Sequence, residues 1–135
     1  FDRTIEQNGL KEMTKKLHKG LITFSPLAQG MLTNRYLDGI PADSRIRTDG
    51  RFLKEDTVNS RIAQVRKLNE LALQRGQTLA EMALAWLLWQ EEVTSVLIGA
   101  SKPQQILDNI KAMENTSFSE EELLKIEEIS QSTNA

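Results

Sequence analysis

The spacing of apolar residues predicts five helices and two strands. Apolar side chains three or four positions apart, which share one helix face, occur at about residues 8–19, 56–76, 79–89, 103–113 and 120–130. Two short runs, 20–24 and 93–98, are continuously apolar or β-branched, as in parallel strands that are buried on both faces. The order helix, strand, helices, strand, helix is typical of α/β folds with parallel strands.

Local signals predict where several of these helices begin and end. Thr78 with Glu81, and Ser119 with Glu122, are three residues apart and match the capping box, in which a hydroxyl and a carboxylate cap the first turn. Gly20 follows a basic run and is the predicted end of the first helix. Asp56 or Thr57 is the predicted N-cap of the second helix, which closes at Gly76. Pro103 suits the first position of the fourth helix.

Between residues 27 and 56 the periodicity fails, and glycines, a proline and scattered charges take over. This stretch holds four basic residues: Arg35, Arg45, Arg47 and Arg51. Structureless segments of this length in a compact chain are usually functional or disordered. The sequence therefore predicts a basic loop that is the first place to look for a ligand.

Two strands are too few for a sheet that is stable alone in water, and parallel strands need further strands at their edges. We therefore expect residues 1–135 to be one piece of a single larger domain. The piece comprises about two βα units and a C-terminal helix, cut from a barrel or a doubly wound sheet. Its first residue is Phe1 rather than a methionine, which we also interpret as the mark of a longer polypeptide.

Composition narrows the possible partners. The 17 basic and 19 acidic residues are mixed along the chain and give a net charge of −2, which argues against nucleic acid and anionic membranes as partners. The longest apolar stretch is far shorter than a membrane span. The chain has no cysteine and so no disulfide, which is consistent with the reducing cytoplasm. It also has no thiolate metal ligand, and no metal site is predicted. The lone His18 has no second ligand nearby in sequence.

The junction between the second strand and the fourth helix is the clearest candidate for ligand chemistry. Gly99, Ser101 and Lys102 precede the helix, where free backbone N–H groups and the helix dipole favour an anion. Taken alone, the local sequence favours a plain N-cap over a phosphate site. The basic loop follows the other strand, and loops that leave the C-terminal ends of parallel strands lie on the same side of a sheet. That second element favours the phosphate interpretation.

Two separated motifs resemble the last two strands and cofactor loops of the aldo-keto reductases. The first runs from Phe24 to Gly30 as FSPLAQG and continues through Leu32-Thr33, Tyr36 and Gly39-Ile40-Pro41. The second is VLIGASKPQQ at residues 96–105, followed by Asn109. The resemblance covers nearly the whole chain and is strongest to the subgroup of bacterial glyceraldehyde 3-phosphate reductase-like enzymes and potassium-channel β subunits. It implies the C-terminal portion of a (β/α)₈ barrel that reduces aldehydes and ketones with NADPH.

The resemblance also implies a role for each matching residue. Phe24 would border the nicotinamide, and the pyrophosphate would lie along Ser25, Pro26, Leu27 and Gly30. Arg35 and Arg45 match basic residues of the cofactor loops. The adenosine and its 2′-phosphate would be held by Gly99, Ser101 and Gln105, with Lys102 as an extra cation, and the adenine by Asp108 and Asn109. Asp43 departs from the pattern, because some relatives have an aromatic residue there.

The family's catalytic Asp, Tyr, Lys and His come from earlier strands, and nothing in this sequence matches those motifs, so no catalytic residue is assigned. Tyr36 matches a loop position rather than the catalytic acid. Three hypotheses follow: the NADP(H)-binding part of an enzyme for small carbonyl substrates, a nucleotide-binding regulatory module, and a truncated inactive chain. The last would assemble by pairing the unpaired N–H and C=O groups along the exposed sides of its strands with those of another copy. A homo-oligomer is therefore an open alternative.

Overall fold

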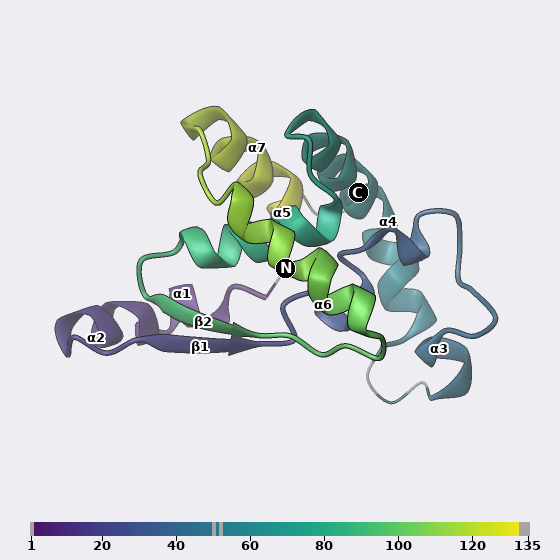
Figure 1. The fold of residues 1–135 in the computed structure, drawn as a ribbon, viewed down its shortest axis with the longest axis horizontal. Helices are drawn as coiled ribbons and strands as arrows, with labels where there is room; N and C mark the ends of the chain where they lie inside the picture. Colours follow the sequence, from purple (N-terminus) through teal and green to yellow (C-terminus); the bar gives the residue numbers. More distant parts are fainter. Residues whose placement is uncertain (1, 50, 52, 133–135) are drawn as a thin grey trace.

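The computed structural model describes residues 2–49, 51 and 53–132. Its helices and strands, with three 3₁₀ turns labelled η, follow one another as in Figure 1. In chain order they are α1 (Thr4–Gln7), α2 (Leu10–Lys16), β1 (Leu21–Phe24), η1 (Ala28–Gly30), η2 (Asn34–Tyr36), α3 (Arg45–Thr48), α4 (Glu55–Gln74), α5 (Leu79–Trp89), β2 (Val93–Leu97), α6 (Pro103–Ile110), η3 (Lys111–Glu114) and α7 (Glu120–Gln131). The chain is thus an α/β structure, as predicted.

The two strands pair in parallel and form a two-stranded sheet. Ile22 lies opposite Ser95, and Phe24 lies opposite Leu97. The register is irregular at the start of β1, between Leu21 and Ile22. Because the strands are parallel and end together, the segments that follow β1 and β2 leave the same edge of the sheet.

A helical layer formed by α4, α5 and α7 carries most of the core. The helix α4 packs against α5 and α7, and α5 also packs against β2 and α6. The buried apolar side chains of this cluster come from these helices and from the long loop: Met31, Tyr36, Leu53, Val58, Val65, Leu68, Leu71, Ala72, Leu79, Met82 and Ile126. The apolar sequence of α5 predicted burial, and Leu79, Met82, Leu84 and Ala85 are indeed buried.

Arg75 connects parts of the helical layer that are far apart in sequence. Its side chain is only 3% exposed and forms an ion pair with Glu122 of α7 at 2.7 Å. The same guanidinium donates to the Ser117 carbonyl oxygen at 2.8 Å and lies 3.8 Å from the centre of the Phe118 ring. Its Nε also donates to Gln77 Oε1 at 2.9 Å, so the charge is paired and each guanidinium nitrogen has an acceptor, which offsets the cost of burying the arginine.

Both predicted capping boxes are present. The Glu81 N–H donates to Thr78 Oγ1 at 3.2 Å, and the Thr78 N–H donates to a Glu81 carboxylate oxygen at 2.8 Å. Ser119 and Glu122 form the same reciprocal pair at the start of α7. Gly76 ends α4 with a φ of +69°, which glycine adopts without strain.

Three predictions about helix ends were wrong. The helix expected at about 8–19 is shorter, because α2 begins at Leu10, after Gly9 with a φ of +78°, and ends at Lys16; the separate helix α1 lies before residue 8. The N-cap of α4 is Lys54, without a side-chain cap, so Asp56 and Thr57 lie inside the first turn. The fourth helix ends at Ile110 rather than near 113 and continues as the 3₁₀ turn η3.

The end of α2 also differs from the prediction that Gly20 closes it. His18 takes the left-handed conformation with a φ of +52°, its N–H donates to the Lys15 carbonyl oxygen, and the Lys19 N–H donates to that of Thr14. Gly20 is needed for a different reason. A Cβ there would lie 1.8 Å from Thr94 Oγ1, so the backbone approaches β2 too closely for any side chain.

The strands are not buried on both faces, contrary to the prediction. The helices lie on one side of the sheet in Figure 1. On the opposite face, which we call the open sheet face, Ile22 is 63% exposed, Phe24 80% and Leu97 57%. No element within residues 2–49 and 53–132 covers these three side chains, which is why their burial fails. Ile22, Phe24 and Leu97 thus form an exposed apolar surface on this face of the sheet.

Candidate cofactor-binding edge

Two loops leave the edge of the sheet where β1 and β2 end. We call residues 25–30 and 98–102, with the start of α6, the strand edge. The pairing of Phe24 with Leu97 puts both loops at this edge, as the sequence predicted. The strand edge therefore brings together two groups of predicted cofactor residues that are almost 70 positions or more apart in the chain.

The first loop has a strained backbone. Ser25, Ala28 and Gln29 have φ values of +51°, +48° and +61°, in the left-handed region that side chains other than glycine rarely adopt. Gly30 follows with a φ of +90°. Two tight turns hold the loop, because the Ala28 N–H donates to the Ser25 carbonyl oxygen and the Gly30 N–H to that of Leu27. Strain of this kind clusters at functional sites, and nothing in the sequence at the first three positions signals it.

The predicted residues of this loop differ in their exposure. Phe24 projects its ring from the open sheet face, and Ser25 is exposed. Pro26, Leu27 and Gly30 are half-buried. The Ser25 hydroxyl oxygen accepts a hydrogen bond of 3.3 Å from the Gln29 side chain. An aromatic ring and exposed hydroxyl thus lie side by side in sequence at the end of β1.

In the second loop three donors converge on one oxygen atom. Gln105 Oε1 accepts from the Ser101 N–H at 2.8 Å, from the Ser101 hydroxyl at 3.2 Å and from the Lys102 N–H at 3.2 Å. Pro103 is the first residue of α6 and adds no donor. The structure thus shows a helix cap, in which the neutral amide oxygen of Gln105 accepts from all three donors. N–H and O–H donors of this kind would also suit a phosphate oxygen.

The other predicted cofactor residues near α6 are Gly99, Asp108 and Asn109. Gly99 is exposed, and a Cβ there would meet nothing within 4 Å, so the structure itself does not require glycine. Asp108 accepts hydrogen bonds from Gln104 and Lys111, both at 3.0 Å, and these bonds hold the pKa of its carboxyl below the ordinary value. Asn109 is half-buried on the same helix. Asp108 is thus charged at neutral pH and already bonded within its own helix.

In the basic loop, Arg35 and Arg51 pair with carboxylates of the same loop. The guanidinium of Arg35 contacts Asp43 Oδ1 at 3.1 Å, and Arg51 contacts Asp49 at 2.7 Å. The side chain of Arg45, a predicted cofactor residue, lies outside the described part of the structure. Asp43 stands where some members of the resembling family have an aromatic residue, and it forms an exposed ion pair with Arg35.

Neither the only tyrosine nor the only histidine is placed for proton transfer at the strand edge. Tyr36 is 2% exposed and belongs to the core cluster. His18 is exposed at the end of α2, which precedes β1 and so lies toward the opposite edge. Within the described residues, no group of three or more His, Asp or Glu side chains is arranged to hold a metal ion. No helix in that part of the chain is long and apolar enough to cross a membrane.

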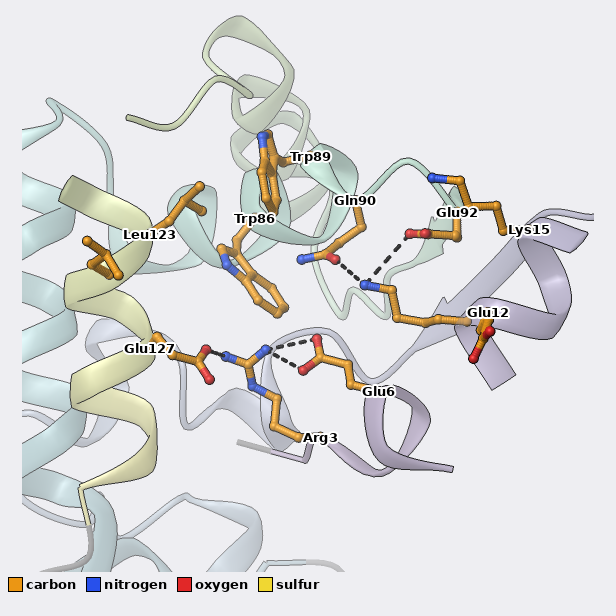
Figure 2. A pocket seen from close by; sticks show the side chains of 12 residues that line it. Arg3, Glu6, Glu12, Lys15, Trp86, Trp89, Gln90, Glu92, Leu123 and Glu127 are labelled. Carbon is orange, nitrogen blue, oxygen red and sulfur yellow. Dashed lines mark hydrogen bonds and ion pairs between the residues drawn. The ribbon is translucent and has the colours of Figure 1, made fainter. Parts of the chain in front are cut away.

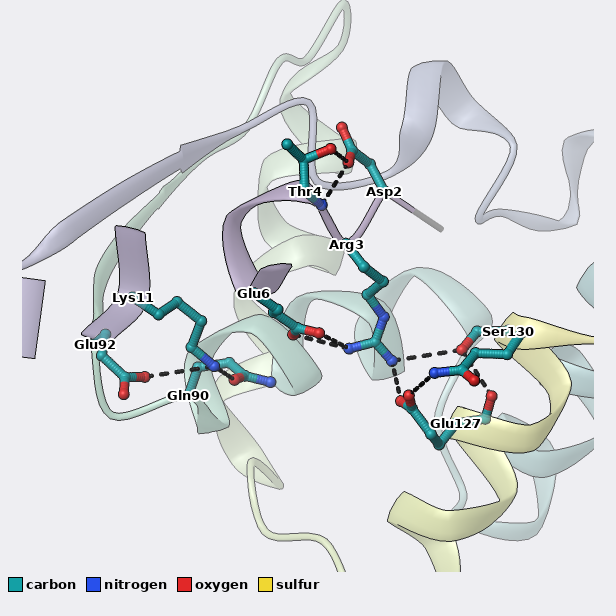
Figure 3. Close-up of polar contacts among 10 residues, drawn as sticks. Asp2, Arg3, Thr4, Glu6, Lys11, Gln90, Glu92, Glu127 and Ser130 are labelled. Carbon is teal, nitrogen blue, oxygen red and sulfur yellow. Dashed lines mark hydrogen bonds and ion pairs between the residues drawn. The ribbon is translucent and has the colours of Figure 1, made fainter. Parts of the chain in front are cut away.

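A hollow of about 720 Å³ lies at the other end of the sheet, and sequence reasoning did not find it (Figure 2). Arg3 lies 4.8 Å from the Trp86 ring centre and pairs with Glu6 at 2.8 Å and with Glu127. Figure 3 shows the same network beside Lys11, which donates to Gln90 at 2.7 Å. These charges connect α1 and α2 to α5 and α7, and we interpret them as structural.

The fold belongs to a recognisable class of α/β structures. Parallel strands joined through helices, with two loops leaving the C-terminal strand ends, form the unit from which α/β barrels and doubly wound sheets are built. The Aldo/keto reductase family matches residues 1–131, and the chain belongs to that family. The resemblance predicted from the two sequence motifs is thus confirmed.

Proteins with similar sequences include both kinds named by the resemblance. An L-glyceraldehyde 3-phosphate reductase from Escherichia coli is 45% identical over 136 residues, which cover 95% of this chain and 38% of the relative. A protein described as a voltage-gated potassium channel subunit beta, from Schizosaccharomyces pombe, is 40% identical over 115 residues, 82% of this chain and 33% of the relative. The chain thus spans less than two-fifths of the length of these relatives.

Solved structures agree with the sequence matches. A glycerol dehydrogenase from Gluconobacter oxydans superimposes with a TM-score of 0.75 at 27% identity, over 96% of this chain and 39% of the other. A thermostable aldo-keto reductase, solved with the inhibitor epalrestat, gives a TM-score of 0.62 at 28% identity, over 95% of this chain and 36% of the other. The chain is therefore an α/β part of an aldo-keto reductase fold.

Proposed function

We propose that this chain is the NADP(H)-binding, C-terminal portion of an aldo-keto reductase barrel, made of about the last two βα units and a C-terminal helix. The observation that carries the proposal is the convergence of three donors of Ser101 and Lys102 on one oxygen of Gln105. A loop that directs two N–H groups and a hydroxyl at one acceptor is suited to a phosphate oxygen in the same place.

The chemistry of the strand edge fits the cofactor in its other parts as well. Lys102 and Arg35 would supply cations for the phosphates, and the exposed Phe24 ring would supply a flat apolar surface beside the nicotinamide. Ser25, Pro26, Leu27 and Gly30 would line the pyrophosphate, with Arg45 nearby. Gly99, Gln105, Asp108 and Asn109 would complete the adenosine end. The bound cofactor would supply the hydride for reduction of the carbonyl.

The proposal assigns binding to this segment and proton transfer to residues outside it. Cofactor enzymes divide labour in this way, because the protein positions the cofactor while a separate acid protonates the substrate oxygen. The substrate would be a small aldehyde or ketone, and the protein would work in the cytoplasm. Residues 1–135 alone would be inactive, since the buried Tyr36 and the remote His18 cannot act as that acid.

The experiment compares NADPH oxidation by the 135-residue chain and by the complete natural polypeptide, with nitrobenzaldehyde as a reactive substrate. We expect turnover only from the complete polypeptide. Turnover that rises in proportion to the purified 135-residue chain would contradict the division of labour. A complete polypeptide that neither binds NADPH nor reduces the aldehyde would overturn the proposed function.

The second candidate is a nucleotide-binding regulatory module that does no chemistry. It is favoured by the 40% identity to a protein described as a potassium channel β subunit. The same experiment separates the two, because a regulatory module binds NADPH tightly without oxidising it. A third candidate, an inactive chain that assembles with copies of itself, is favoured by the open sheet face.

A further inference from the structure

We propose that Asp43 competes with the phosphates of the cofactor for Arg35, and so sets how tightly the strand edge binds them. This inference rests on the proposed function, because it concerns the same site. It adds a residue that the family pattern does not assign to cofactor binding. It also gives the aspartate at position 43 a chemical role.

The contact between the two residues is direct. Arg35 Nη2 donates to Asp43 Oδ1 at 3.1 Å and to the Asp43 carbonyl oxygen at 3.3 Å. Within the part of the chain that the structure describes, Asp43 is the only hydrogen-bond and ion-pair partner of the Arg35 guanidinium. The Arg35 side chain is 42% exposed and that of Asp43 is 81% exposed. A ligand can therefore reach the arginine, and the carboxylate can move away into water.

The backbone of Arg35 is tied to the loop that carries the predicted pyrophosphate residues. Its N–H donates to Thr33 Oγ1 at 3.1 Å, and the Thr33 hydroxyl donates to the Gly30 carbonyl oxygen at 2.7 Å. The next residue, Tyr36, is buried in the core, and the Leu37 carbonyl oxygen accepts from Arg66 of α4 at 2.8 Å. The position of Arg35 is thus fixed, whereas only its guanidinium can exchange partners.

A phosphate and a carboxylate are alternative partners for one guanidinium, because both accept its N–H donors and both neutralise its charge. When Asp43 holds Arg35, a phosphate at the strand edge meets a compensated cation and a nearby negative charge. Binding then requires the phosphate to displace or share the contact. Exposed ion pairs contribute about 0.2–1 kcal/mol, so releasing Arg35 should tighten cofactor binding about two- to fivefold at most.

The test measures NADPH affinity by fluorescence quenching in the complete natural polypeptide carrying Asp43→Asn. Asp38→Asn is the matched control: it removes the same charge from an exposed position on the same loop, and Arg35 forms its ion pair with Asp43 rather than with Asp38. We expect about two- to fivefold tighter binding for Asp43→Asn and little change for Asp38→Asn. The difference should shrink in high salt, because exposed charges are screened.

A double substitution makes the assignment specific. If Asp43 acts through Arg35, then Asp43→Asn should have no effect on NADPH affinity in an Arg35→Ala background. Equal effects of Asp43→Asn and Asp38→Asn, weaker binding by Asp43→Asn, or an effect that persists without Arg35 would each overturn the inference. A parent protein that fails to bind NADPH would instead overturn the proposed function, so the two failures are distinguishable.

Discussion

In the helical layer core side chains such as Val65, Leu68 and Leu79 are almost fully buried, whereas on the open sheet face Ile22, Phe24 and Leu97 are all more than half exposed. The polar groups differ in the same way. The helical layer satisfies Arg75 with an ion pair, a carbonyl oxygen and an aromatic ring. The strand edge instead holds the donors of Ser101, and the basic loop holds Arg35, in exposed contacts with flexible side chains.

This difference separates two tasks within one short chain. The side chains of the helical layer pack against one another in a core, so they are not available to bind another molecule. The open sheet face and the strand edge present apolar surface and exchangeable polar contacts. A binding surface has to stay exposed, and its polar groups have to be able to exchange their hydrogen-bond partners.

The largest expected effect compares one leucine from each region in the 135-residue chain. Leu68→Ala should lower the free energy of unfolding by about 2–5 kcal/mol, because Leu68 is buried and its loss leaves a cavity. Leu97→Ala should change it by about 0.5 kcal/mol or less, since its side chain already contacts water. Urea unfolding at a protein concentration too low for the chain to associate, followed by tryptophan fluorescence, measures both. Equal losses would show that Leu97 is buried in solution and that the comparison fails.

The open sheet face should also make the isolated chain associate. Light scattering should give a mass at least twice the 15.3 kDa of one chain, because the uncovered strands and apolar face can pair with another copy. Ile22→Lys should reduce this association. Leu124→Lys is the control, since Leu124 is just as exposed but lies on α7 of the helical layer. A compact monomer that melts cooperatively would show that the face needs no cover.

The smallest expected effect concerns pH and the ion pair between Arg75 and Glu122. Partial burial on its own raises the pKa of Glu122, but the Ser119 N–H and the Arg75 guanidinium outweigh it, so the pKa lies below its ordinary value of 4.5. A lowered pKa stabilises the fold above about pH 4.5, and this contribution is lost as the pH falls through the folded-state value.

Glu122→Gln should therefore cost on the order of 1 kcal/mol at pH 7, and the difference from the parent should narrow as the pH falls below 4.5. Glu121→Gln is the matched control, because Glu121 pairs only with Lys125 one turn away and is well exposed. It should have a smaller effect. Urea unfolding at several pH values gives the comparison, and a Glu122→Gln difference that stays constant down to pH 3 would contradict it.

The sequence predicted best the features that depend on residues close together in the chain. The boundaries of α5 agree with its apolar pattern, and both capping boxes need only a hydroxyl and a carboxylate three residues apart. The end of α2 was wrong because His18, rather than Gly20, takes the left-handed position, and only the approach to Thr94 shows why glycine is at position 20.

The strand edge was predictable in its residues but not in their contacts. Parallel strands were enough to place Ser25 and Ser101 at one edge. Nothing local predicts that Gln105 places its amide oxygen on the donors of Ser101 and Lys102, or that Asp43 pairs with Arg35. Those contacts depend on the path of the long loop and on the rotamers of exposed side chains, which sequence periodicity does not determine.

The central claim is that the strand edge holds the phosphates of NADP(H), and cofactor affinity tests it most directly. In the complete natural polypeptide, Ser101→Ala and Lys102→Ala should each weaken NADPH binding by about one to two powers of ten, because charge-assisted hydrogen bonds contribute about 1.5–3 kcal/mol. NADH should be affected much less, since it lacks the 2′-phosphate. Lys16→Ala, which removes the same charge from the exposed surface of α2 near the opposite end of the sheet, is the control and should leave both affinities unchanged. Equal weakening of NADPH and NADH by both substitutions would contradict the assignment and leave the junction a plain helix cap.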